Sequence, residues 1–174
     1  MEDQERTSIL VTVTKSSEKG YPYPSKCSRE AFEWILENIV RTNVGRFDLL
    51  FLHVQHPNTP DAEYVAAVDM LDYFDDRCIQ IGVAHFSWVA RGVDPKVVIC
   101  DQVKQMNADI LVLGNKKRAS IQRFFNRGES VIEYCSKQAE CHVITVNVKA
   151  EAAQRSIVLQ EELDPNSSRR NLLP

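Results

Sequence analysis

The chain has 174 residues, about the size of one domain, and 44% of them are hydrophobic, enough to build a single buried core. The chain has a formal net charge of -3 and so lacks the overall basicity that non-specific nucleic-acid binding needs. No nucleic-acid partner is therefore expected. The charged start MEDQERT is unlike a secretory signal, and no apolar run approaches the length that spans a membrane. We therefore expect a soluble protein without a membrane partner, in a cytoplasmic or nucleocytoplasmic location.

Short apolar runs alternate with amphipathic helical patterns along the chain. Four runs are almost continuously hydrophobic, which predicts strands of a parallel sheet that are buried on both faces. They are residues 9–13, 48–54, 110–114 and 142–148. Residues 83–90 alternate more plainly between apolar and polar positions, which predicts an edge strand.

The first two helices are predicted by apolar stripes at helical spacing. The first stripe comprises Ala31, Phe32, Ile35, Leu36, Ile39 and Val40. The second comprises Val65, Val68, Leu71, Phe74 and Cys78, and Gly82 is expected to end that helix.

The last two helices are predicted by their start signals. Asp94 followed by a proline is typical of a helix N-terminus, after which Val97, Val98 and Val103 are expected to face the sheet. Ser130 with Glu133 three residues later has the spacing of a capping box.

Regular alternation of strand and helix predicts a doubly wound, three-layer α/β sandwich with ligands bound at the carboxyl ends of the strands. The loops after Val13 and Gly114 are expected to meet there. Residues 1–148 form the predicted domain. Residues 149–174 lack a strong core pattern and are expected to be a largely mobile extension.

The segment between the last two predicted strands has the layout of a phosphate-binding loop. Gly114, Gly128 and Ser130 supply tight turns and a helix N-terminus, where backbone N–H groups can face an anion. Lys117 stands where a further glycine would help, and Glu129 places a negative charge beside the phosphate position. The sequence therefore indicates an anion site that has been altered.

Other constellations carry less weight. Gly128-Glu129-Ser130 lacks the second glycine of a nucleophile elbow, and capping explains Ser130 better. His53 and His56 have a metal-like spacing, but no compact ligand set accompanies them. The five cysteines form no CxxC pair, which favours reduced thiols.

The chain contains, in this order, the segments YPYPS, AFEWILENIV, LHVQ, GVDPKVVICDQV, ADILVLG and ECHVITV. This series of segments resembles that of small, single-domain plant universal stress proteins. The resemblance covers roughly residues 9–148. It implies a five-stranded parallel sheet in the order 3-2-1-4-5, of the adenine nucleotide alpha hydrolase-like kind. It also implies a homodimer formed through the strand at residues 141–148. Some members of the family bind ATP or AMP.

The family's nucleotide-binding positions can be carried over residue by residue. Thr12, Val54 and Leu113 match positions that line the adenine pocket, and their sizes are compatible with it. Thr14 stands where the family usually has an acid, so it offers a hydrogen bond but no charge for a ribose or a magnesium ion. The base pocket is therefore expected to be better preserved than the phosphate pocket.

In the phosphate loop the resemblance places the first glycine at Gly114 and the second on Lys117. The third element aligns with Gly128, Ser130 and Val131 if two extra residues are allowed. A negative charge such as that of Glu129, about 5 Å from a phosphate charge, costs roughly 3 kcal/mol of binding free energy at an effective dielectric near 20. The same pair costs under roughly 1 kcal/mol in water. Lys116, Lys117 and the arginines that follow are able to replace lost backbone contacts, or to form only a solvated basic loop.

The resemblance implies a stress-response protein whose altered ATP or AMP site serves as a regulatory ligand site, and not an enzyme. An alternative is a dimeric interaction or chaperone-like module that has lost nucleotide binding. Slow ATP hydrolysis is a third possibility, although the sequence offers no general base or metal-holding acid near the loop.

Overall fold

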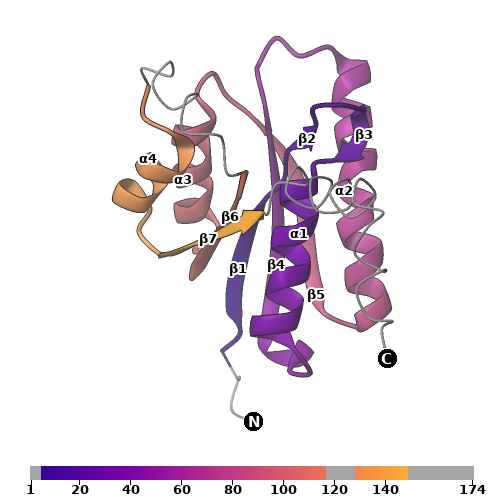
Figure 1. Ribbon diagram of the computed structural model, residues 1–174, viewed down its shortest axis with the longest axis vertical. Coiled ribbons are helices and arrows are strands. Elements are labelled where there is room, and N and C mark those ends of the chain that lie inside the picture. The colour runs from indigo at the N-terminus through magenta and orange to yellow at the C-terminus, as the bar shows by residue number, and fades with distance from the viewer. Residues whose placement is uncertain (1–4, 117–127, 149–174) are drawn as a thin grey trace, which may run out of the picture.

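The computed structural model describes residues 5–116 and 128–148 of the chain. Its centre is a five-stranded sheet in the order β5-β4-β1-β6-β7 (Figure 1). These strands are β1 (Thr7–Thr12), β4 (Phe47–Gln55), β5 (Ala84–Arg91), β6 (Ile110–Lys116) and β7 (His142–Val148). Every neighbouring pair is parallel. The predicted order 3-2-1-4-5 is confirmed, and residues 84–91 form an edge strand as expected.

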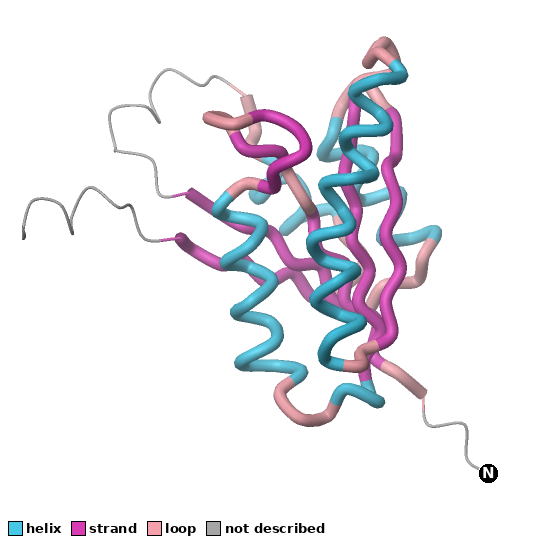
Figure 2. Tube along the Cα trace, turned by 90° about the vertical axis from the view of Figure 1, so that its right-hand side faces the viewer, coloured by secondary structure: helices cyan, strands magenta, loops and turns pink. Residues whose placement is uncertain are grey.

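Helices cover both faces of this sheet (Figure 2). One face carries α1 (Lys26–Ile35), which continues as a π-helix at Leu36–Val40, together with α2 (Asp61–Ile81). The other face carries α3 (Pro95–Gln105) and α4 (Val131–Gln138). A short 3-10 helix, Val44–Arg46, leads into β4.

Each face of the sheet has its own core, because successive side chains of a strand point to opposite sides. Under α1 and α2, the rings of Phe32, Phe51 and Phe74 lie with their centroids 5.1–5.4 Å apart. Under α3 and α4 the core consists mainly of leucines, among them Leu10 and Leu111. Two consecutive residues of one strand therefore face the two opposite sides of the sheet.

Most of the expected helix faces and caps are confirmed. The stripe predicted for α1 is buried, with Ile39 only partly so. Gly82 ends α2 with φ of 74°, the left-handed conformation that glycine adopts without strain. Asp94 caps α3 by accepting a hydrogen bond from the N–H of Lys96.

Three valines were placed on the wrong side of their helices. On α2, Val65 and Val68 are 58% and 42% exposed, and Ala67 and Met70 are buried in their place. The α2 sequence is apolar on two adjacent stripes, and packing against the sheet selects the one that contains Met70. On α3, Val97 is 38% exposed, whereas Ile99 is buried.

The insertion after β1 forms a small antiparallel hairpin of β2 (Lys15–Ser16) and β3 (Gly20–Pro24). It includes a cis peptide bond between Tyr21 and Pro22 and packs against α2. All five cysteines are free thiols, and Cys78 and Cys135 are buried.

The expected extension at residues 149–174 lies outside the described residues. Among those that are described, no helix has both the length and the apolar character needed to cross a membrane.

Candidate functional site

Three of the predicted pocket residues lie together at the carboxyl edge of the sheet. Thr12, Val54 and Leu113 are at or near the ends of β1, β4 and β6, which are neighbours in the sheet. Leu113 belongs to the core under α3 and α4, Val54 packs against it, and Thr12 shares the face of Leu10 by strand alternation. The Thr12 hydroxyl donates to the carbonyl of Val112 across 3.4 Å. The three residues therefore share the face of the sheet that carries α3 and α4, and their role in a binding site stays a prediction.

Thr14 is held by the start of α1. Its hydroxyl oxygen is 2.7 Å from that of Ser25 and 3.3 Å from that of Ser28, and its N–H donates to Ser28 Oγ across 2.9 Å. Ser28 is 2% exposed. The Thr14 side chain therefore hydrogen-bonds to the start of α1, at the position where the family usually has an acid.

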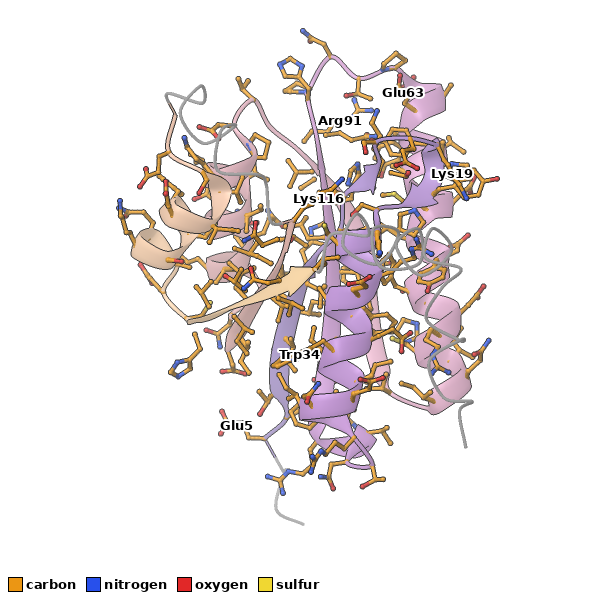
Figure 3. All side chains as sticks on the ribbon, viewed as in Figure 1. Glu5, Lys19, Trp34, Glu63, Arg91 and Lys116 are labelled. Atoms are coloured by element: carbon orange, nitrogen blue, oxygen red, sulfur yellow. The ribbon has the colours of Figure 1, made fainter. Side chains whose placement is uncertain are left out.

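Gly114 and Lys116 face the opposite side of the sheet from Leu113. A Cβ atom added to Gly114 would lie 2.7 Å from the carbonyl oxygen of Cys27, in the first turn of α1. Lys116, which is labelled in Figure 3, lines a cavity together with Cys27. The structure thus does not bring the Lys116 side chain together with Thr12, Val54 and Leu113, and it shows that close helix packing also requires a glycine at position 114.

The amino end of α4 is closed by the predicted capping box. Ser130 Oγ accepts from the N–H of Glu133 across 3.1 Å, and Glu133 Oε2 accepts from the N–H of Ser130 across 3.2 Å. The first four N–H groups of a helix have no intrahelical acceptor, so the N–H groups of Val131 and Ile132 remain available in this turn. Together with the helix dipole, they are the groups of α4 that can face an anion.

Glu129, the acid that sequence analysis placed beside the phosphate position, forms an ion pair. Lys137 Nζ donates to Glu129 Oε1 across 2.8 Å. The hydrogen bond and the charge of Glu129 raise the pKa of Lys137. The carboxylate is therefore directed toward the second turn of α4 and is partly neutralised there. Gly128 is exposed, with open space around it, and Lys117 lies outside the described residues.

Sequence analysis missed a buried polar chain at the end of β4. The His53 Nδ1–H donates to the carbonyl of Val13 across 2.8 Å, so Nε2 accepts from the Tyr21 hydroxyl across 2.7 Å. That hydroxyl accepts from Gln55 Nε2 across 2.9 Å. His53 and Gln55 are 5% and 4% exposed. Two polar residues at the end of an apolar run were the available signal. They tie the hairpin to the end of β1.

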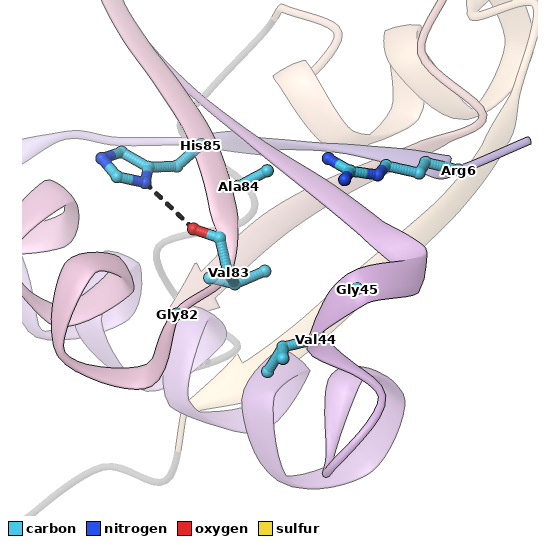
Figure 4. Close-up of a pocket in the computed structure, with 7 residues that line it drawn as sticks. All are labelled: Arg6, Val44, Gly45, Gly82, Val83, Ala84 and His85. Carbon is cyan, nitrogen blue, oxygen red and sulfur yellow. Dashed lines mark hydrogen bonds between the residues drawn. The ribbon is translucent and has the colours of Figure 1, made fainter. Parts of the chain in front are cut away.

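A second cavity, of about 480 Å³, lies at the opposite edge of the sheet, where β4 and β5 begin (Figure 4). Arg6, Gly82 and His85 are among its lining residues, and the His85 Nδ1–H donates to the carbonyl of Val83 across 3.1 Å. None of the predicted site residues line it. Across residues 5–116 and 128–148, no three His, Cys, Asp or Glu side chains are grouped to hold a metal ion.

This sheet order, with helices on both faces and a capped helix beside the carboxyl edge, defines a doubly wound α/β protein. The sequence profile described as "Universal stress protein family" matches residues 20–147. The chain therefore belongs to the universal stress protein family.

Individual relatives agree with this assignment. A universal stress protein A-like protein of Arabidopsis thaliana is 36% identical over 166 residues, which cover 84% of this chain and 93% of the relative. The crystal structure of an Arabidopsis thaliana universal stress protein family protein with AMP bound is 37% identical, with a TM-score of 0.66 over 83% of this chain and 94% of that one. A family member from Burkholderia pseudomallei shares the fold at 19% identity, with a TM-score of 0.58 over 80% of this chain and 95% of that chain.

Proposed function

We propose that this universal stress protein binds an adenine nucleotide, AMP or ATP, as a regulatory ligand at the carboxyl edge of the sheet, on the face of α3 and α4. The observation that carries the proposal is the grouping of Thr12, Val54 and Leu113 on the face that also holds α4. The relative that was solved with AMP bound is similar to most of this chain, which supports the same ligand class here.

The base end of this site is apolar, and the phosphate end depends on α4. Adenine would pack against Val54 and Leu113, while the N–H groups of Val131 and Ile132 would face the phosphate. The Glu129–Lys137 pair lowers the repulsion that an isolated carboxylate would exert on that phosphate. Thr14, engaged by Ser25 and Ser28, carries no charge for a magnesium ion. We therefore propose a site in which the base contributes more of the affinity than the phosphate.

The proposed role is that of a ligand-responsive protein without efficient chemistry of its own. A ligand that binds only the folded state stabilises it in proportion to RT ln(1 + [L]/Kd), so nucleotide level would be coupled to stability. The alternative, a dimeric interaction module without nucleotide binding, is favoured by β7, which lies at an open edge of the sheet with Val143 and Ile144 half-buried. An edge of this kind is suited to pairing with a second copy.

Substitution of Val54 tests the placement of the base. We expect Val54→Phe to fill the base pocket and abolish AMP binding in a calorimetric titration, while Val68→Phe, at an exposed valine of α2, leaves it intact. A urea unfolding curve of each variant would show whether the fold is preserved. Wild-type affinity in a folded Val54→Phe variant would contradict this placement.

A further inference from the structure

A basic cavity lies on the opposite face from the proposed nucleotide site. It has a volume of about 590 Å³ and opens between the β2–β3 hairpin, the first turn of α1 and the ends of β6 and β7. Its charged lining consists of Lys19, Lys26, Arg29, Lys116 and the single acid Glu18. Cavities of this size hold a drug-sized ligand or the side chains of a few residues.

The cavity carries an excess of positive charge. Its four cations and one acid give a formal charge of +3. Lys26 pairs with Glu30 across 3.5 Å, and Lys19 lies over the ring of Tyr23 at 5.5 Å. Within the described part of the chain, Arg29 and Lys116 have no carboxylate within 4.0 Å. These two cations are therefore available to an anionic partner.

Aromatic surface accompanies the charge. Tyr23 of the hairpin and Tyr73 of α2 are 51% and 43% exposed, and both line the cavity. An occupant that combines carboxylates with apolar side chains would match such a lining better than a simple inorganic anion.

The chain itself leaves β7 at this cavity. Val148, the last residue of β7, belongs to its lining. Nine residues further on begins the segment IVLQEELD, residues 157–164, which joins four aliphatic residues to Glu161, Glu162 and Asp164. Nine extended residues span up to about 30 Å, which is several times the width of such a cavity. The segment can therefore reach every side chain of the lining.

We propose that residues 157–164 of the same chain dock in this basic cavity. The segment has a formal charge of -3, equal and opposite to that of the lining. Its short connection to Val148 gives it an effective concentration on the order of millimolar, so weak contacts suffice for occupancy. Docking covers Cys27 and contacts Lys116.

The thiol of Cys27 provides the readout, because it lines the cavity. Iodoacetamide labelling of the full-length protein, followed residue by residue by mass spectrometry, is expected to be slow at Cys27 in the wild type. Glu161→Gln, Glu162→Gln and Asp164→Asn together should accelerate it several-fold, and so should Arg29→Gln. Loss of a nearby cation favours the thiol over the reactive thiolate, so acceleration by Arg29→Gln reports lost docking and not a change in thiol chemistry.

Matched controls and a charge exchange complete the test. Arg46→Gln, at an exposed arginine before β4, and Glu151→Gln, outside the segment, should leave the Cys27 rate unchanged. Arg29→Glu combined with Glu161→Arg should restore slow labelling. Buried Cys78 must stay slow in every variant, which shows that the fold is intact. Equal Cys27 rates in wild type and variants would overturn the proposal, and a rate that falls with protein concentration would assign the docking to a second copy and overturn the same-chain assignment.

Discussion

At the scale of single residues, His53 is the titratable group that couples the end of β1 to the hairpin. Burial of its ring lowers the pKa of His53 below its ordinary value of 6.5, despite the hydrogen bond to the carbonyl of Val13. The unfolded chain therefore binds a proton more readily than the folded one. The contribution of His53 to stability is fully present above pH 6.5 and is lost as the pH falls from 6.5 through the lower pKa of the folded state.

Urea unfolding on both sides of pH 6.5 checks this expectation. The free energy of unfolding should fall on acidification, and His53→Gln, which cannot titrate, should show a smaller fall. His56→Gln changes a surface histidine close by and is the matched control. An identical pH dependence in wild type and His53→Gln would show that His53 is not responsible.

Gly114 and Gly128 were both predicted as parts of a phosphate loop, and their surroundings in the structure differ. Gly114→Ala places a methyl group 2.7 Å from the Cys27 carbonyl oxygen, and overpacking of this kind costs about 1–3 kcal/mol. Gly128→Ala meets no atom of the described residues within 4 Å, and a surface change of this kind stays within about 0.5 kcal/mol. Chemical denaturation measures both, and equal stabilities of the two variants would contradict the packing role of Gly114.

At the scale of elements, α4 depends on its cap because it is only 8 residues long. Ser130→Ala removes the acceptor for the Glu133 N–H, and we expect a loss of about 1 kcal/mol in the free energy of unfolding. Ser136→Ala, on the exposed side of the same helix, should be neutral or slightly stabilising, since alanine is the better helix former. If both variants unfolded alike, the cap would not support α4.

The edge strand β7 is the element through which we expect two copies to pair. Charged side chains on an edge strand oppose such pairing. Thr145→Lys should therefore shift the sedimentation mass from dimer to monomer. Thr59→Lys, at an equally half-buried threonine before α2, should leave the dimer intact. A wild-type protein that sediments as a monomer would exclude this interface.

The regular elements were predictable from sequence, whereas the direction of several side chains was not. The strands are apolar on both faces and the helix caps have fixed residue spacings, so their positions follow from local patterns. Val65 and Val68 were misplaced because α2 offers two apolar stripes. Lys116 was expected to contact the phosphate, but strand alternation places its side chain on the opposite face from Leu113. The β2–β3 hairpin depends on contacts of Tyr21 with His53 and Gln55, which are distant in sequence.

At the scale of the whole molecule, the two faces of the sheet are suited to different partners. The face of α3 and α4 carries the proposed nucleotide site and the amino end of α4, and the face of α1 and α2 carries the basic cavity. Gly114 and Lys116 lie in β6, which belongs to the sheet between these two faces.

We propose that the site on the face of α3 and α4 binds an adenine nucleotide. Calorimetric titration of the nucleotide-stripped protein with AMP, and with ATP in the presence and absence of magnesium, tests it directly. We predict micromolar AMP binding, on the order of -8 kcal/mol, with little dependence on magnesium. No detectable heat and no shift in thermal stability at millimolar nucleotide would contradict the claim and favour the interaction module.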